Sequence, residues 1–213
     1  KVTQKEAREV GRPRGLSPAK REQILEGSRA VFTELGYERA SVDAIAAAAG
    51  VSKATVYKHF GDKQGLFLGT FGLENEQVRQ RFIGLLEEPT GDIEGDLQEI
   101  GAQLLRLVSA ARQVQRYRVA CGAMERFPEV GRALYDSSIK VGRARIVHFI
   151  ERAVAAGQLA VDSAEEAATD FHALCVGYLT LELHLGARQT LTEAEIAQRV
   201  PRAVDRFLRL YRA

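Results

Sequence analysis

Several residue types that would mark a specialised class of protein are scarce in this sequence of 213 residues. Its two cysteines, Cys121 and Cys175, lie far apart and outside any CxxC spacing, so neither a disulfide framework nor a zinc module is indicated. No window offers the roughly 18 uninterrupted apolar residues that a membrane span needs, and no charged and apolar leader opens the chain. We therefore expect a cytoplasmic globular protein without a membrane partner, metal site or cofactor.

The charge of the chain is unevenly distributed, although the net charge is only +2. Residues 1–63 hold 12 Lys and Arg against 8 Asp and Glu, which is a net +4. Residues 64–213 hold 18 against 20, which is a net −2. The basic excess at the front favours a polyanionic partner for that part of the chain.

Apolar residues recur at helical spacing almost throughout, and no alternating run of β-branched residues is long enough for a strand. The sequence therefore predicts an all-α protein of about nine helices, which begin and end at Ser, Pro and Gly signals. The expected ranges are 18–35, 41–49, 52–60, 62–88, 92–110, 112–126, 128–156, 164–187 and 192–212.

The second and third of these helices have the layout of a helix-turn-helix. Gly50 can adopt the left-handed conformation of the tight turn, and Val56 with Phe60 would anchor the third helix to the first. No acidic residue lies between Asp43 and Asp62. Because DNA presents a dense line of phosphates, the face opposite the anchors is predicted to enter the major groove.

Roles on this face follow from side-chain chemistry and from position on the helix. We expect Lys58, Thr55 and Lys53 to hydrogen-bond base edges, and the Ala54 methyl group to meet a thymine methyl group. Phosphate contacts are expected at the sides of the helix and at exposed helix starts. The residues predicted to make them are Tyr57, His59, Lys63, Ser41 and Ser52.

A basic arm precedes the first helix. The stretch GRPRG, residues 11–15, places Arg12 and Arg14 around a proline, as arms that enter the minor groove often do. A disordered basic tail is an equally open interpretation. The chain is thus predicted to consist of an arm over 1–16, a helix-turn-helix domain over 17–63 and a larger helical domain over 64–213.

Glycines recur along the helix expected over 62–88. Gly65, Gly69 and Gly72 follow one another at spacings of four and three, which places them on one helix face. One hypothesis is that this stripe lets the helix slide against the first helix. Relief of local crowding is the alternative.

Two apolar stripes run along the helix expected over 164–187. One stripe could complete the protein's own core, while the other, together with the last helix, pairs with a second subunit. In the alternative, both stripes belong to the core of one protomer. The predicted dimer interface consists of Phe171, Leu174, Leu181, Leu185, Val200, Val204, Phe207 and Tyr211.

The aromatic and soft side chains of the middle helices are candidates for binding a small, largely apolar effector. An enzyme with Cys121 or Cys175 as nucleophile can also be written, but no turn or oxyanion-forming segment presents either thiol. An architectural DNA-binding protein without an effector is a further alternative, which the length of the larger domain disfavours. The predicted effector-binding residues are Tyr117, Met124, Phe127, His148, Cys175 and Tyr178.

The segment SVDAIAAAAGVSKATVYKHFGDKQGLF, residues 41–67, resembles the DNA-binding signature of the tetracycline-repressor (TetR) family. This resemblance implies a homodimeric bacterial regulator, usually a repressor, that acts at the nucleoid on a palindromic double-stranded DNA operator. It further implies an effector-binding C-terminal domain whose last two helices form the dimer interface. Tyr57, His59 and Lys63 match family positions that contact phosphate, and Lys53 to Thr55 match those nearest the bases. The segment ERFPEVGRALYDSSI, residues 125–139, also resembles an AefR-like subgroup.

Overall fold

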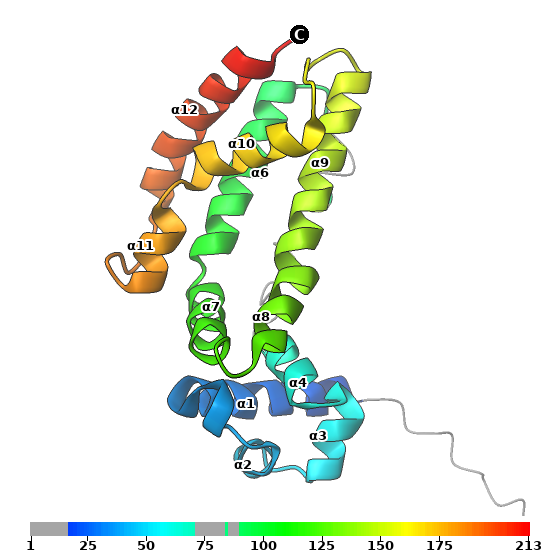
Figure 1. The fold of residues 1–213 in the computed structure, drawn as a ribbon, viewed down its shortest axis with the longest axis vertical. Helices are drawn as coiled ribbons and strands as arrows, with labels where there is room; N and C mark the ends of the chain where they lie inside the picture. Colours follow the sequence, from blue (N-terminus) through cyan, green and yellow to red (C-terminus); the bar gives the residue numbers. More distant parts are fainter. Residues whose placement is uncertain (1–16, 71–83, 85–89) are drawn as a thin grey trace, which may run out of the picture. The chain divides into compact units, whose positions relative to one another are not determined.

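The computed structural model describes residues 17–70, 84 and 90–213, which form helices joined by short connections (Figure 1). In these ranges the only β-type pairing is an isolated bridge between Leu159 and Arg212, so the predicted all-α class is confirmed. We find no described helix that combines the length and apolar character needed to span a bilayer. The described chain divides into two compact units, of which the first consists of residues 17–35 and 39–70.

The helices of the first unit begin at clear local signals. α1 (Pro18–Arg39) begins directly after Ser17, and Gly36 interrupts it with a φ of 73°, where the sequence predicted its end. Apart from residue 84, the predicted continuation of the fourth helix towards residue 88 lies outside the described residues. The other helices of this unit are α2 (Val42–Ala48), α3 (Lys53–Phe60) and α4 (Lys63–Thr70).

The first unit has an aromatic core with one buried polar link. The fully buried rings of Phe32 and Phe67 meet edge to face, with centroids 5.4 Å apart. The hydroxyl oxygens of Ser28 and Thr70, both buried, lie 2.6 Å apart and share a hydrogen bond. These two contacts fix the described part of α4 against α1.

The second unit contains the remaining helices, which enclose a larger core. Two helices that were predicted as continuous are interrupted. A π-helical turn separates α8 from α9, and Gly177, with a φ of 51°, separates α10 from α11. The elements are α6 (Ile93–Ser109), α7 (Ala111–Ala123), α8 (Pro128–Leu134), η1 (Tyr135–Ile139), α9 (Lys140–Ala155), α10 (Ala164–Val176), α11 (Leu179–Leu185) and α12 (Glu193–Tyr211).

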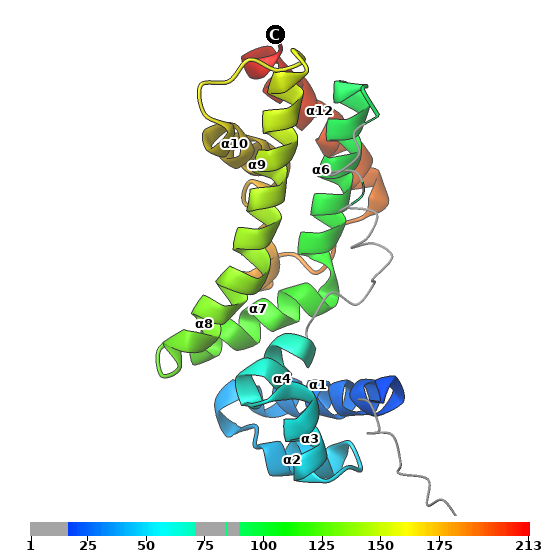
Figure 2. The same cartoon turned by 90° about the vertical axis from the view of Figure 1, so that its right-hand side faces the viewer.

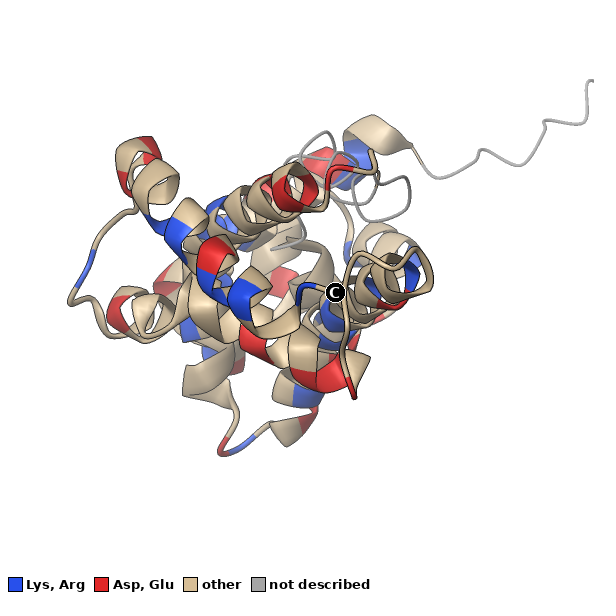
Figure 3. Ribbon diagram, turned by 90° about the horizontal axis from the view of Figure 1, so that it is seen from above, with Lys and Arg blue, Asp and Glu red and all other residues tan. Residues whose placement is uncertain are grey.

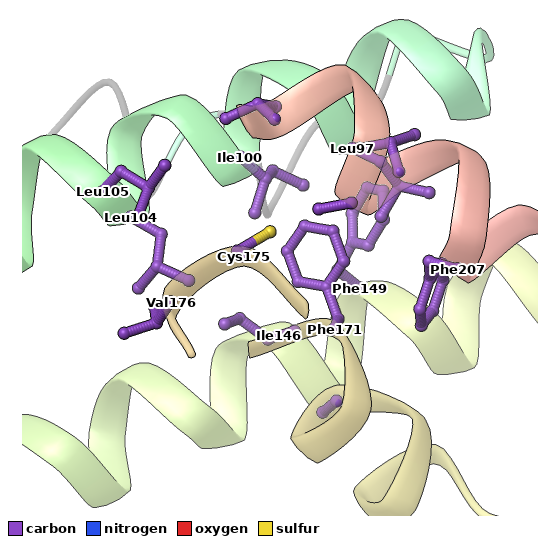
Figure 4. Packing of buried hydrophobic residues seen from close by; sticks show 14 of the residues in the cluster. Leu97, Ile100, Leu104, Leu105, Ile146, Phe149, Phe171, Cys175, Val176 and Phe207 are labelled. Carbon is purple, nitrogen blue, oxygen red and sulfur yellow. The ribbon is translucent and has the colours of Figure 1, made fainter. Parts of the chain in front are cut away.

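The core of the second unit lies among α6, α9, α10 and α12 (Figures 1 and 2). α10 packs against both α9 and α12, and α12 packs against α6. Figure 4 shows Phe171 and Cys175 of α10 in this core, and Phe207 of α12 meets Phe171 with ring centroids 5.3 Å apart. Gly101 of α6 permits the close packing, because a Cβ there would lie 3.1 Å from Val200 and 3.3 Å from Cys175.

An arginine from α12 stabilises the break between α10 and α11. The Arg199 guanidinium donates hydrogen bonds to the carbonyl oxygens of Cys175 at 2.5 Å and Val176 at 2.8 Å, which are the last residues of α10. These carbonyls have no partner within their helix, and a cation is favourable at this end of the helix dipole. The interruption at Gly177 therefore depends on a side chain that lies more than twenty residues further along the chain.

The second unit carries charges of both signs. Figure 3 shows both Lys and Arg positions and Asp and Glu positions on the ribbon. Arg106 of α6 pairs with Glu193 at the start of α12, with an Nη2 to Oε2 distance of 2.6 Å, and Arg188 pairs with Glu182 at 3.1 Å. This mixture differs from the basic excess of residues 1–63.

Candidate DNA-binding site

α2, the following turn and α3 form the predicted helix-turn-helix, and a serine caps the start of each helix. Ser41 Oγ accepts a hydrogen bond from the Ala44 amide at 3.0 Å, and Ser52 Oγ accepts one from the Thr55 amide at 3.2 Å. Gly50 in the turn has a φ of 60°, which glycine adopts without strain. Each serine hydroxyl already accepts a hydrogen bond from one backbone amide of its own helix. The other amides of the first turn could therefore donate to a phosphate.

The helix-turn-helix is attached to α1 through a very close approach at Gly27. A Cβ at this position would lie 2.7 Å from the backbone nitrogen of Ala49, just after α2. Gln23, one turn earlier on α1, donates from Nε2 to the Ala49 carbonyl oxygen at 2.7 Å. A single glycine within a helix forms no spacing pattern, so the sequence did not reveal this contact.

The two predicted anchors hold α3 onto the rest of the unit. Val56 is 1% exposed. Phe60 is half-buried, and the Arg21 guanidinium lies over its ring, 5.3 Å from the centroid. From α4, a Cβ at Gly69 would lie 2.9 Å from a ring carbon of Phe60. Contacts from α1 and α4 therefore fix the orientation of α3.

The face of α3 opposite these anchors is accessible to solvent. Lys53, Ala54 and Lys58 are exposed, and Tyr57 is 44% exposed. Thr55 lies at the edge of the face and is half-buried. This surface is open to solvent in the first unit, whereas the individual DNA contacts stay predictions.

Two of the three residues predicted to read bases already have partners within the protein. The Lys53 ammonium lies 2.8 Å from Oδ2 of Asp43, and this hydrogen bond, with the carboxylate charge, raises the pKa of Lys53. The Thr55 hydroxyl oxygen lies 2.7 Å from that of Ser52, with which it shares a hydrogen bond. Asp43 therefore brings a carboxylate to the edge of a face that carries none of its own.

The other predicted contacts differ in how accessible they are. His59 is half-buried, and its Nδ1 is buried without a hydrogen-bond partner among the described residues, so Nε2 is the nitrogen that could reach a phosphate. Lys63 is the first residue of α4 and is half-buried. Arg12 and Arg14 of the basic arm lie outside the described residues.

The predicted effector-binding residues do not gather at one place in the second unit. Tyr117 stacks on His184 with ring centroids 4.3 Å apart, and Phe127 is half-buried at the start of α8. Cys175 is completely buried in the core, and burial raises the pKa of its thiol to about 12. His148 and Tyr178 lie on the surface, so the structure does not support them as lining residues of an enclosed pocket.

A shallow groove lies beside α8 and the π-helical turn. It has a volume of about 460 Å³. Met124, which is 42% exposed, is the one predicted effector-binding residue that lines it. The space at Gly131 is filled by this side chain, because a Cβ there would lie 2.6 Å from the Met124 sulfur. The residues lining the groove are Met124, Pro128, Gly131, Arg132, Tyr135 and Asp136.

The predicted dimer-interface residues range from exposed to fully buried. Leu181 and Leu185 of α11 are 52% and 75% exposed, and Leu174 and Tyr211 are half-buried. The burial of the remaining four contradicts their predicted place in the interface, because a side chain buried in the protomer's own core offers no surface to a partner. These four, all at most 3% exposed, are Phe171, Val200, Val204 and Phe207.

Comparison with known proteins identifies both parts of the chain. A family model described as "Bacterial regulatory proteins, tetR family" matches residues 24–70, which include the helix-turn-helix. A second model, "AefR-like transcriptional repressor, C-terminal domain", matches residues 95–213 and thus more than half of the chain.

Individual proteins agree with these matches. BdcR, an HTH-type transcriptional repressor of Escherichia coli strain K12, is 29% identical over 124 residues, or 58% of this chain and 57% of BdcR. The chain spans about half the length of the first curated relatives that it matches. The structure of the flavonoid-responsive regulator FrrA is 29% identical and has a TM-score of 0.71, with 92% of this chain and 98% of FrrA covered.

A TetR-family regulator of Mesorhizobium loti MAFF303099, 24% identical, shares the fold with a TM-score of 0.78 over 92% of this chain and 98% of its own. The exposed face of α3, the helical second unit and these matches lead to one assignment. The chain belongs to the TetR family of DNA-binding transcriptional regulators and carries an AefR-like C-terminal domain.

Proposed function

We propose that this protein is a repressor that binds a palindromic double-stranded operator as a homodimer and is released by a small, largely apolar effector. The observation that carries the proposal is the exposed face of α3, which has no acidic residue and is held outward by Val56 and Phe60. In such a dimer the two α3 helices would enter major-groove segments about 34 to 36 Å apart, or a multiple of that spacing. Its place of action is the nucleoid in the bacterial cytoplasm.

The proposed roles divide between the predicted domains. Within residues 17–63, bases are read by Lys58, Lys53, Thr55 and Ala54. Phosphates are bound by residues at the margins of α3 and at the helix starts, with the arm over 1–16 reaching the minor groove. Residues 64–213 serve effector binding and dimerisation. The proposed phosphate contacts are Tyr57, His59, Lys63, Ser41 and Ser52, with Arg12 and Arg14 from the arm.

The proposed dimer surface includes the exposed apolar side of α11. Leu181 and Leu185 are exposed there, and Tyr178, directly before the helix, is 78% exposed. Positions 178, 181 and 185 lie on one helical face. Contiguous exposed apolar residues of this size are typical of an association surface, which supports a partner subunit at this place.

The proposed effector is small and largely apolar. The groove beside α8 is lined by Met124, Pro128 and Tyr135, and its volume of about 460 Å³ lies within the usual range for small-molecule sites. FrrA is named as a flavonoid-responsive regulator, and flavonoids are aromatic compounds. An aromatic effector for this chain is therefore consistent with both the groove and this relative.

The decisive experiment selects bound sequences from a pool of random duplexes and then screens small molecules for release from the selected duplex. A two-fold symmetric consensus, binding that weakens steeply with salt, and release by an aromatic compound would support the proposal. An architectural protein would yield no consensus. Enrichment of an asymmetric site bound by one protomer would contradict the dimeric operator.

A further inference from the structure

An ion pair connects the two helices of the helix-turn-helix on the surface assigned to DNA. Asp43 is the second residue of α2, and Lys53 is the first residue of α3. The Lys53 Nζ to Asp43 Oδ2 distance is 2.8 Å, and the two side chains are 49% and 69% exposed. The pair therefore lies in solvent, where a DNA phosphate or base edge could compete for the lysine.

The position of Lys53 is not explained by the local energetics of α3. A cation in the first turn faces the positive end of the helix dipole, where Asp or Glu would be favourable. Asp43 offsets this unfavourable charge from the neighbouring helix. Local conflicts of this kind are expected at functional sites, where binding rather than helix stability selects the residue.

Non-specific DNA binding depends on how many phosphates the protein neutralises with free cations. A lysine held by a carboxylate at 2.8 Å adds little to that attraction, since its charge is already compensated. Its ammonium is also restricted to one region of the surface. A base edge placed there can accept a hydrogen bond from it, whereas an arbitrary phosphate must first separate the pair.

We infer that Asp43 is a specificity-determining positioning residue, which restrains Lys53 and thereby lowers the affinity for non-operator DNA more than the affinity for the operator. This inference rests on the proposed function and adds a control of specificity to it. Asp43 acts through Lys53 and does not itself contact DNA. Its removal frees a cation and widens the range of sequences that are bound.

The test compares Asp43→Asn with Asp62→Asn, which makes the same charge change in the same unit. Asp62 Oδ1 accepts a hydrogen bond from the Gly65 amide at 2.7 Å as the cap of α4, and asparagine can retain that bond. Each substitution is also made together with Lys53→Gln. The probes are a duplex of mixed sequence and the duplex selected by the wild-type protein, both titrated over a range of salt. Thermal unfolding checks that all variants are folded.

We expect Asp43→Asn to tighten binding to the mixed-sequence duplex by about two- to fivefold at low salt. The dependence of log K on log salt should steepen by up to about 0.9, as for one added phosphate contact. Operator affinity should change less, so the specificity ratio falls. Asp62→Asn should have a smaller effect, and the effect of Asp43→Asn should vanish beside Lys53→Gln.

Two results would overturn the inference while leaving the proposed function intact. In one, Asp43→Asn and Asp62→Asn change mixed-sequence binding equally. In the other, the effect of Asp43→Asn persists when Lys53 is glutamine. If the wild-type protein does not distinguish the selected duplex from the mixed one, the proposed function fails, and the inference fails with it.

Discussion

The side chains on the exposed face of α3 form two groups according to what they contact in the unbound protein. Lys53 is held by Asp43, and the Thr55 hydroxyl is bonded to that of Ser52. Lys58 and Tyr57 extend from the same helix into solvent. Substitutions in the second group therefore report on DNA contacts without first breaking a contact inside the protein.

Lys58→Ala and Tyr57→Phe should weaken DNA binding in different ways. Loss of a lysine that reads a base edge should cost about 1 to 3 kcal/mol at the preferred sequence and relax the preference at one position. Loss of a hydroxyl that binds phosphate should cost about 0.5 to 1.5 kcal/mol for every sequence. Affinities for a set of single-base operator variants measure both effects. A uniform loss from both substitutions would contradict base reading by Lys58.

Protonation of His184 should make the second unit less stable in mild acid. Its ring is stacked on Tyr117, and burial, followed by the charge of Arg118, lowers the pKa of His184 below 6.5. The uncharged His184 ring contributes fully to the free energy of unfolding at neutral pH, because the ring is uncharged in both the folded and the unfolded chain. As the pH falls below about 6.5 and through the lowered folded pKa, the unfolded chain binds the proton more readily, so the free energy of unfolding decreases.

His184→Phe isolates this effect, because phenylalanine can remain stacked on Tyr117 but cannot take up a proton. Urea unfolding of both proteins at neutral and mildly acidic pH measures it. The wild-type protein should lose more stability over that range than the variant. Equal losses would assign the acid sensitivity to other groups.

Among the elements, the crossing of α1 with the end of α2 leaves little room for an added side chain. Gly27→Ala should destabilise the first unit by about 1 to 3 kcal/mol, because the new Cβ meets the backbone of Ala49 rather than a movable side chain. Gly142→Ala in α9 is the control, since a Cβ there meets no atom within 4 Å. That substitution should stabilise its helix by up to about 1 kcal/mol. Denaturant titration of both variants tests the difference in sign.

The helix starts could be predicted because their signals are local. Ser17 before Pro18, Ser41 and Ser52 each act within one turn, and the structure confirms all three starts. The break at Gly177 was missed because an Arg199 bond from α12 stabilises it, and apolar spacing continues across the glycine. Helix ends that depend on distant side chains leave no pattern in the adjacent sequence.

The candidate sites could be predicted where they depend on a single helix, and could not where they depend on the packing of distant helices. The exposed face of α3 is a property of one helix and its two anchors, so helical periodicity was sufficient to find it. Burial of Phe171 and exposure of Tyr178 depend on which helices pack against α10 and α11. Two apolar stripes on one predicted helix do not say which of them meets the protomer's own core.

For the whole molecule, operator binding should depend on association through α11. Leu181→Asp combined with Leu185→Asp places two charges on the proposed dimer surface and should weaken dimerisation by at least about 30-fold, because burying an unpaired charge is costly. Operator affinity should fall with it, since one protomer contacts one half-site. Sedimentation and operator titration provide the measurements. The control is Ile139→Asp, which alters a residue that is 40% exposed on the π-helical turn. A double variant that remains dimeric would exclude this surface.

The buried Ser28–Thr70 bond bears on how a signal can travel along the fourth helix. Slippage of α4 over α1 would separate the two hydroxyls, each of which would keep only its bond to a carbonyl oxygen of its own helix, and would pull the Phe32 and Phe67 rings apart. Gly69, against the Phe60 ring, fits local crowding better than a sliding track, and Gly72 lies outside the described residues. A displacement that reaches residue 70 should therefore move α1 and α4 together rather than slide one helix past the other.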